Sequence, residues 1–527
     1  MTTLSDAGQE QNSCLPTRLI LLLLPLLLFA APACAEDVVE LWRSASFAYA
    51  VAVSVNPMDD SCWVADLGSA QVVHLAEDGA ELWRGEGFSD PGGVSVVATD
   101  GSCWVASNDG FNGRFVHLDA DGRLLQEVPV VGYTVAVSAN PVDGSVWAAV
   151  NVYPELNSHV ILLAADGAER ARVDFEEPVS SLSANPRDGS CWVALGTVAA
   201  PSVAHLSATG EVLWRGVSGL GATAVSVNPA DGSCWVALGD GSAAHLAPDG
   251  TELWRGPGGS PLSVNPTDGS CWMGAGTEGP GVCHLAKDGT ELWQEQGTTG
   301  PCDLSANYYD GSCWVADLVD GQVAHFAVVG YQGPAFRDIA AWFWAYDEIG
   351  VCADANIVKG YTDGTYQPTL PVSRDQMAVY IARALVRPSG DAGIPDPEPP
   401  PAFPDVPATH WAYRQIEYAV SRNVVTGYED GTYRPDLVVD RGQMAVYIAR
   451  AMVAPTGDAG IPDPEPPPTF PDVPGEDGSS AWCYKHVEYL AGQGIVTGYQ
   501  DGYYHPEYPV TRDQMAVYVA RAFDLPS

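Results

Sequence analysis

The sequence predicts a multidomain chain in which an all-β seven-bladed propeller is followed by an α-helical domain. A tryptophan-centred unit recurs seven times between residues 38 and 327, and a helix–turn–helix unit recurs three times between residues 334 and 525. An apolar segment precedes both. We expect a signal peptide at 1–35, the propeller at 36–328, helical modules at 334–388, 403–453 and 470–525, and Pro-rich linkers at 389–402 and 454–469.

The first 35 residues have the pattern of a secretory signal peptide. Arg18 precedes an apolar core at 19–30, and Ala33-Cys34-Ala35 matches a small-residue cleavage site. Pro25 and the shortness of the core argue against a permanent membrane span, which needs about 20 apolar residues. We therefore expect export and no transmembrane segment after cleavage.

The charge balance excludes some partners. Against 24 Lys+Arg stand 66 Asp+Glu, a net charge of −42. Nucleic acid and anionic membranes would repel such a chain. Solubility is the simplest account of the charge. We expect no cofactor; the acidity suits a Ca²⁺-rich exterior, but no motif supports a Ca²⁺ site.

The seven-fold unit has the period of a propeller blade. The fullest copies hold four short β-prone runs, separated by Asn-Pro-x-Asp-Gly and Asp-Gly turns in which Pro fixes φ and Gly takes a positive φ. Copies recur every 37 to 45 residues, as blades do. The motif tryptophans are Trp63, Trp104, Trp147, Trp192, Trp235, Trp272 and Trp314.

The seventh unit lacks its fourth run, and that run stands at the start of the mature chain, at 38–43. We expect it to complete the last blade and close the ring, which removes exposed edges. This closure resembles that of NHL-type and related propellers. The resemblance implies a fold and names no ligand.

Six of the 12 cysteines and six of the 10 histidines follow the repeat, which favours structural roles for them. Equivalent positions in neighbouring sheets lie about 10 Å apart, beyond the roughly 7 Å that a disulfide spans. We interpret the cysteines before the motif tryptophans as small buried residues, whereas Cys283 and Cys302 fall off the register and are candidates for one pair. The six repeated histidines are His74, His117, His205, His245, His284 and His325, with Leu162 at that place in the third unit.

One histidine per blade does not converge on a metal ion, so we predict structural hydrogen bonding for them. The tryptophans are expected to pack between blades rather than bind sugar. Tyr133, Tyr153 and Asp303 depart from the repeat, but nothing links them. The sequence therefore predicts no catalytic residue and no metal ligand.

The three C-terminal modules share ordered elements. Each has a Phe-x-Asp element, a Trp 16 residues before a Gly-Tyr turn, and a second helix that begins after a capping residue. The Phe-x-Asp elements are 336–339, 403–406 and 470–473; the turns are 360–368, 427–435 and 498–506; the caps are Ser373, Asp440 and Thr511. Two identical linkers, GDAGIPDPEPPP, separate the modules and are expected to be extended.

This arrangement resembles the S-layer-homology (SLH) family, whose F-x-D-V, H-W-A, G-Y-x-D-G-T-F-x-P and T-R-A-E elements recur here in order. Three copies is that family's usual number. The resemblance implies a pseudo-trimeric helical prism whose grooves bind anionic, often pyruvylated, cell-wall polysaccharide or peptidoglycan itself. It also implies a secreted protein of the cell wall or cell surface (S-layer).

The residues also suggest such a site. Each cap stands three positions before a Gln, the capping-box pattern, and an Arg follows each cap, where a cation opposes the helix dipole. An anionic target held jointly by the Arg and the helix N-terminus explains this; an internal salt bridge to the Asp of the Asp-Gly turn is the alternative. The candidate polymer-binding residues are Arg374, Arg441, Arg512, Trp344, Trp411, Trp482, Asp338, Asp405 and Asp472.

The tryptophans either stack on a sugar face or hold the first helix, and both roles stay open. Gly442 weakens one helix start, and the family's Glu is replaced by Gln in all three copies. The three grooves therefore need not be equally competent, and the choice of polymer stays open.

These observations predict a non-catalytic surface protein that is anchored non-covalently to wall polymer and displays its propeller to a protein or glycan partner. Two alternatives remain: a wall-anchored propeller enzyme, such as a lyase or hydrolase, and a structural S-layer subunit.

Overall fold

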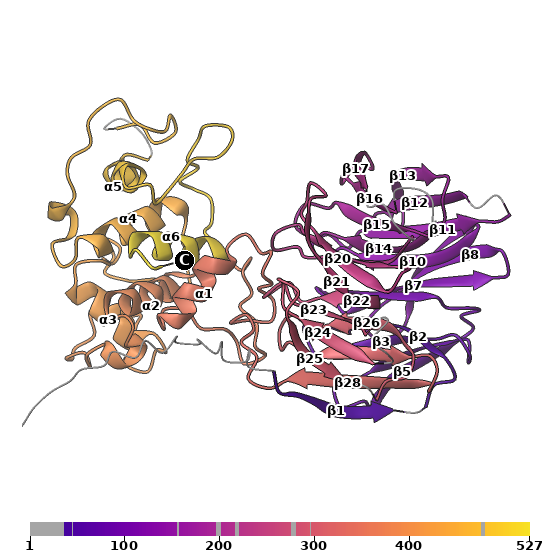
Figure 1. Ribbon diagram of the computed structural model, residues 1–527. Helices are drawn as coiled ribbons and strands as arrows, with labels where there is room; N and C mark the ends of the chain where they lie inside the picture. Colours follow the sequence, from indigo (N-terminus) through magenta and orange to yellow (C-terminus); the bar gives the residue numbers. More distant parts are fainter. Residues whose placement is uncertain are drawn as a thin grey trace, which may run out of the picture. The chain divides into compact units, whose positions relative to one another are not determined.

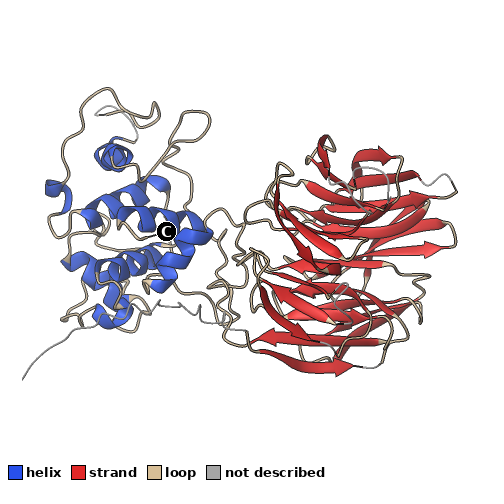
Figure 2. Cartoon of the chain, in the orientation of Figure 1, coloured by secondary structure: helices blue, strands red, loops and turns tan. Residues whose placement is uncertain are grey.

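The computed structural model describes residues 36–44, 46–154, 157–196, 202–216, 221–275, 281–295, 297–475 and 480–526. The predicted signal peptide lies outside these residues. Within them, no helix is long and apolar enough to cross a membrane. All strands precede all α-helices along the chain (Figures 1 and 2).

The described residues between 38 and 328 form seven antiparallel four-stranded sheets, as the repeat predicts. The first four blades are β2 (Ala50–Asn56), β3 (Ser61–Asp66), β4 (Gln71–Leu75), β5 (Glu81–Glu86); β6 (Gly93–Val97), β7 (Ser102–Asp109), β8 (Asn112–Leu118), β9 (Leu124–Val131); β10 (Tyr133–Ala139), β11 (Val146–Val152), β12 (Asn157–Leu163), β13 (Glu169–Phe175); and β14 (Val179–Ala184), β15 (Cys191–Leu195), β16 (Val203–Leu206), β17 (Val212–Gly216). The last three are β18 (Ala222–Val227), β19 (Cys234–Leu238), β20 (Ser242–Leu246), β21 (Glu252–Pro257); β22 (Gly259–Val264), β23 (Cys271–Gly274), β24 (Val282–Leu285), β25 (Glu291–Glu295); and β26 (Pro301–Ala306), β27 (Cys313–Asp317), β28 (Gln322–Val328) with β1 (Val38–Ser44).

The ring closes as predicted, because β1 pairs with β28 in the order β1-β28-β27-β26. A series of side-chain hydrogen bonds between neighbouring blades also closes the ring along its inner strands. The Oγ of a serine on each inner strand accepts a hydrogen bond, at 2.9–3.1 Å, from a backbone N–H of the next blade. The seven serines are Ser54, Ser95, Ser138, Ser183, Ser226, Ser263 and Ser305. Ser305 of the last blade accepts from the Val55 N–H of the first blade, so this series of hydrogen bonds runs continuously around the ring.

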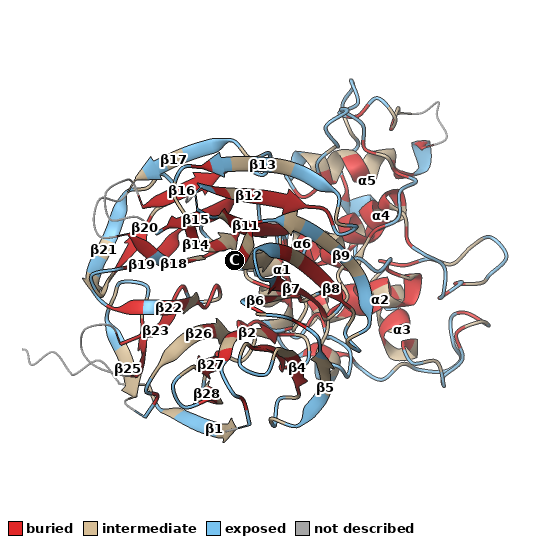
Figure 3. Cartoon of the chain, turned by 90° about the vertical axis from the view of Figure 1, so that its right-hand side faces the viewer, coloured by how far each residue is buried: buried red, intermediate tan, exposed pale blue. Residues whose placement is uncertain are grey.

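The motif tryptophans fill the space between blades, as predicted. Trp63, for example, packs against Val94 and Val96 of the second blade, and Trp314 packs against Val53 and Val55 of the first. All seven are at most 1% exposed. Exposed residues lie instead on outer strands such as β13, β17 and β21 (Figure 3).

The repeated histidines are structural. All six stack on the motif tryptophan of their own blade, with ring centroids 4.3–4.6 Å apart. In four blades the Nε2 atom also hydrogen-bonds a serine Oγ at 2.8–2.9 Å. Burial lowers the pKa of His325 to about 4, so this side chain is neutral at pH 7.

The described cysteines are all free. Those before the motif tryptophans are fully buried, as expected. The candidate pair does not form, because its members face opposite neighbours. Cys283 packs toward Trp235 of the fifth blade, whereas the Cys302 Sγ donates to the Ala50 carbonyl oxygen of the first blade at 3.0 Å.

Within the described residues, the C-terminal part holds six α-helices, two in each module. They are α1 (Tyr346–Asp354), α2 (Arg374–Leu385), α3 (Tyr413–Ser421), α4 (Arg441–Met452), α5 (Ala481–Gly492) and α6 (Arg512–Ala522), with the short 3₁₀ turns η2 (Gly390–Gly393) and η3 (Gly457–Gly460) in the linkers. Each second helix packs on the first helix of another module: α2 on α3, α4 on α5 and α6 on α1. One hydrophobic core draws on all three modules.

A cyclic set of backbone hydrogen bonds joins the modules ahead of their second helices. The Val372 N–H donates to the Val510 carbonyl, Val510 N–H to the Val439 carbonyl, and Val439 N–H to the Val372 carbonyl, at 2.9–3.0 Å. This triangle gives the helical part three-fold pseudosymmetry. It is the expected pseudo-trimeric prism.

Candidate functional site

The prism carries three equivalent grooves, numbered here by the module that supplies the Gly-Tyr turn and the second helix. Each also takes an Arg from one other module and a Trp from the third. The first groove is lined by Tyr361, Gln376, Tyr380, Arg383, Trp411 and Arg512. The second has Tyr428, Gln443, Tyr447, Arg450, Trp482 and Arg374, and the third has Tyr499, Gln514, Tyr518, Arg521, Trp344 and Arg441. Every groove therefore needs all three modules.

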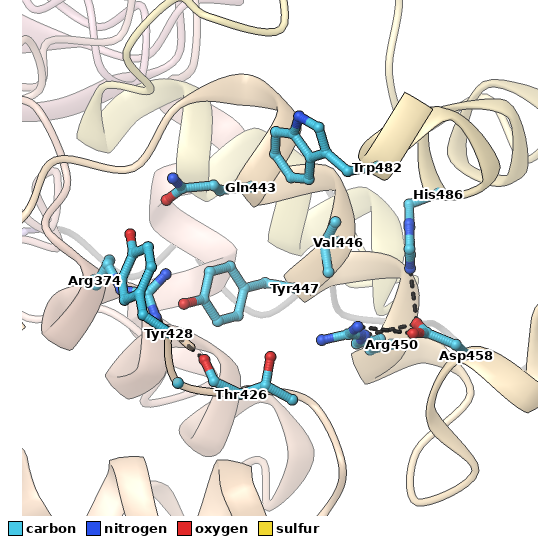
Figure 4. A pocket seen from close by; sticks show the side chains of 11 residues that line it. Arg374, Thr426, Tyr428, Gln443, Val446, Tyr447, Arg450, Asp458, Trp482 and His486 are labelled. Atoms are coloured by element: carbon cyan, nitrogen blue, oxygen red, sulfur yellow. Dashed lines mark hydrogen bonds and ion pairs between the residues drawn. The ribbon is translucent and has the colours of Figure 1, made fainter. Parts of the chain in front are cut away.

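The grooves differ in size. The second has a volume of about 460 Å³, against about 190 Å³ for the first and about 210 Å³ for the third. Figure 4 shows the second groove, with Arg374, Tyr428 and Tyr447 at one end and Arg450, Asp458 and His486 at the other.

The predicted caps start the second helices. Ser373, Asp440 and Thr511 are the N-caps, and the arginines occupy the first helical position. The helix N-termini, however, are not free to bind an anion, and that part of the expectation is wrong. The N–H groups of Arg374 and Asp375 donate to the Leu437 and Pro435 carbonyls, and the other two helices repeat this arrangement.

The three arginine side chains lie buried at the groove floor, with 4–6% exposure. Each Nε donates to a tyrosine carbonyl of another module at 2.8 Å. Each Nη2 donates to a second carbonyl, at 2.9–3.3 Å. Two tyrosine rings lie 4.4–5.1 Å from each guanidinium carbon. These contacts hold the cation in place without neutralising it.

The alternative of an internal salt bridge is wrong. Among the described residues, no ion pair includes Arg374, Arg441 or Arg512. The aspartates of the Asp-Gly turns are used inside their own turns; the Asp363 carboxylate, for example, accepts from the backbone and hydroxyl of Thr365. Burying a charge without a counter-charge costs free energy. The arrangement therefore suits an external anion.

The family model of the S-layer homology domain matches residues 335–378, 402–445 and 470–516. The chain carries three SLH domains.

Curated relatives share part of this chain. Cell surface glycoprotein 1 of Acetivibrio thermocellus is 27% identical over 175 residues, which is 32% of this chain and 7% of that protein. The cellulosome-anchoring protein of the same organism is 26% identical over 175 residues, 33% of this chain and 37% of that protein. An endoglucanase of Bacillus sp. (strain KSM-635) is 25% identical over 181 residues, 34% and 18% respectively. The chain thus spans well under half of the length of each relative.

The SLH tryptophans lie at the groove walls and are 52–61% exposed. Two are held by aspartates at the second helical position of a neighbouring module. The Trp344 Nε1 donates to Asp513 at 3.0 Å, and the Trp411 Nε1 donates to Asp375 at 2.8 Å. In the second groove Gly442 replaces that aspartate, and Trp482 leans over the glycine. Exposure leaves the ring faces open to a ligand.

The SLH aspartates Asp338, Asp405 and Asp472 do not line the grooves. Their carboxylates accept hydrogen bonds from two successive backbone N–H groups of the Gly-Tyr turn, as Asp338 does from Tyr366 and Gln367 at 2.6 Å. The structure places them where they shape the turn that carries the groove tyrosine.

Several groove residues escaped the sequence interpretation. The most notable are Arg383, Arg450 and Arg521, late in the second helices. The signal was present, because the string MAVY[IV]ARA recurs in all three modules. Its arginine lies one helical turn after the groove tyrosine and two turns after the groove glutamine. A repeated charge inside an otherwise apolar helix marks either a surface position or a site.

The non-repeat residues of the propeller do not form one site. The Tyr133 hydroxyl of the third blade donates to Asp90. Asp303 belongs to the seventh blade, where its carboxylate accepts from the Val53 N–H at 2.8 Å. Tyr153 is 46% exposed. The described residues contain no cluster of three or more His, Cys, Asp or Glu side chains able to hold a metal ion.

Proposed function

We propose that this protein is displayed on a bacterial cell surface, where its three SLH domains bind an anionic secondary cell-wall polysaccharide or peptidoglycan non-covalently. The propeller presents a binding or packing surface and has no catalytic role. The observation that carries the anchoring proposal is the buried guanidinium at the floor of each groove, which has no carboxylate partner among the described residues.

The neighbouring groups support an anionic sugar polymer. An arginine fork binds carboxylate or phosphate with directed hydrogen bonds. The exposed tryptophan of each groove offers an apolar face for the C–H face of a sugar ring. Three grooves on one rigid body would multiply the affinity of a repetitive polymer for the chain. The names of the cell-surface and anchoring relatives point the same way.

The test is co-sedimentation of the full chain with purified sacculi of a bacterium whose surface proteins carry SLH domains, with and without extraction of the anionic polymer. The variant Arg374→Ala/Arg441→Ala/Arg512→Ala is expected to bind at least about 100-fold more weakly, equivalent to ~2.7 kcal/mol. A variant that binds like wild type would refute the anchoring site.

Two further variants separate binding from folding. Trp344→Ala/Trp411→Ala/Trp482→Ala removes largely exposed side chains and should weaken binding, while stability falls only by the two lost hydrogen bonds to Asp513 and Asp375, about 0.5 kcal/mol each. Arg84→Gln/Arg172→Gln/Arg255→Gln removes an equal number of positive charges, here from Glu–Arg pairs at the surface of outer propeller strands. This control should bind as wild type does. If it loses as much affinity as the groove variants, net charge rather than the grooves explains binding.

A further inference from the structure

The three grooves differ in the state of the arginine late in each second helix. In the first groove, Arg383 donates to both oxygens of Asp391, Nε to Oδ1 at 2.7 Å and Nη2 to Oδ2 at 2.8 Å. In the second, Arg450 makes the same two bonds to Asp458, both at 2.7 Å. The two aspartates belong to the identical linkers that follow the first and second modules.

Other side chains strengthen these pairs. Lys359 and Gln415 also donate to Asp391, and the His486 Nε2 lies 2.8 Å from Asp458. The arginine bonds hold the pKa of both aspartates well below its usual range, so both are ionised at pH 7. Each linker thus places a fixed carboxylate beside its groove.

The arginine of the third module, Arg521, differs from the other two. Arg521 is exposed and lines the third groove with Arg441, and among the described residues neither arginine pairs with a carboxylate. The other walls of this groove are complete. Trp344 is held by Asp513, and Tyr499 and Tyr518 flank the buried guanidinium.

We propose that the third groove is the principal binding site of the prism, and that its ligand group is a carboxylate of an acidic sugar, which Arg521 holds as Arg383 and Arg450 hold the linker aspartates. Asp391 and Asp458 are then internal competitors that weaken the first and second grooves. This inference rests on the proposed function, since it ranks grooves that are taken to bind wall polymer.

The carboxylate class follows from the fold itself. The same arginine, on the same turn of the same repeated helix, binds a planar carboxylate through Nε and Nη2 in two of three copies. In the third groove, the Nε and Nη2 atoms of Arg521 have no carboxylate partner among the described residues, so a ligand carboxylate can bind them directly. In the other two grooves it must share or displace an aspartate that is tethered beside the arginine, where the effective concentration is high.

The test compares three matched variants of the full chain, Arg383→Gln, Arg450→Gln and Arg521→Gln, by co-sedimentation with sacculi that retain their anionic polymer. Each variant loses one charge from an equivalent position. We expect Arg521→Gln to raise the half-saturating concentration about tenfold or more, and the other two to raise it less than about threefold. Equal losses in all three, or a larger loss in Arg383→Gln or Arg450→Gln, would overturn the ranking.

A gain-of-binding arm tests the competitors. In the Arg521→Gln background, Asp391→Asn/Asp458→Asn should recover binding at least about threefold, because it frees the two matching arginines. Unchanged or weaker binding by a variant that melts as its parent does overturns the competitor role. If the aspartate variant unfolds, the three single arginine variants still decide the ranking.

The two proposals fail differently. If the triple variant of the buried arginines binds like wild type, the anchoring proposal itself is wrong. If that variant loses binding but Arg383→Gln, Arg450→Gln and Arg521→Gln lose it equally, anchoring stands and only the ranking is wrong.

Discussion

Replacing Gly442 by Asp should stabilise the prism and narrow its second groove. The glycine occupies the helical position at which Asp375 and Asp513 hold the other two tryptophans. A Cβ at residue 442 would lie 2.9 Å from the Cζ2 and Cη2 atoms of Trp482. These atoms are the far end of a side chain that is 52% exposed, so the ring can move aside. The buried Cys483 Sγ, 3.3 Å from the same Cβ position, must shift by a few tenths of an ångström.

The expected gain is the sum of three small contributions. Replacing Gly inside a helix gains about 0.3 kcal/mol, because Gly costs about 1 and Asp about 0.7 kcal/mol relative to Ala. A carboxylate in the first helical turn adds about 0.3–1 kcal/mol. A hydrogen bond from Trp482 Nε1 adds about 0.5 kcal/mol at an exposed site. The new carboxylate would lie near the Asp440 cap, and repulsion between like charges costs about 0.2–0.5 kcal/mol; at the other two helices the cap is a hydroxyl that donates to the aspartate instead. The free energy of unfolding should therefore rise by about 1 kcal/mol.

Urea unfolding of the full chain, followed by tryptophan fluorescence and far-UV circular dichroism, measures this change. The reverse variants Asp375→Gly and Asp513→Gly are the controls and should lose at least as much, because each also loses the hydrogen bond from its cap hydroxyl. A crystal structure of Gly442→Asp should show a second groove of about 200 Å³, like the other two. Destabilisation by Gly442→Asp, or reverse variants that unfold like wild type, would refute the reasoning.

Three further predictions concern the frame of the molecule. Burial raises the pKa of Asp303 to about 7, above the usual value of about 3.9. The contribution of the protonated side chain to stability is therefore present below about pH 4 and is lost as the pH rises through about 7. The melting temperature of Asp303→Asn relative to wild type should be higher at pH 8 than at pH 4, and a pH-independent difference would contradict this. Deleting residues 36–44 removes β1 and exposes the edge of β28, so calorimetry and size-exclusion chromatography should show a lower melting temperature and association, whereas an unchanged monomer would argue against closure by this strand. Asp405→Ala removes the acceptor for the Tyr433 and Arg434 N–H groups and should cost about 3 kcal/mol in urea unfolding; lost sacculus binding without lost stability would assign Asp405 to the ligand instead.

The repeats made much of the fold predictable. The spacing of Trp63 to Trp314 gave the blade count, and the missing fourth run of the last unit predicted the pairing of β1 with β28. Local signals were also sufficient for the helix starts, because a cap and its Gln act within one turn. Such features depend on neighbours in sequence or on strict periodicity.

The grooves needed the structure because they join positions that are far apart in the chain. Arg512 meets Tyr361 and Trp411 only through the three-fold packing, and no spacing reveals that meeting. The occupied helix N-termini were hidden for the same reason, since the carbonyls that fill them come from another module. The linker aspartates looked like parts of a spacer, yet the carboxylates of Asp391 and Asp458 accept hydrogen bonds from arginines that line the grooves.

The triangle of Val372, Val439 and Val510 has a consequence for how attachment is lost. In this ring each module donates to one neighbour and accepts from the other, so removing any one module leaves an unmatched donor and an unmatched acceptor. The same removal takes a wall from all three grooves. We therefore expect the loss of any one module to impair all three grooves together rather than one at a time.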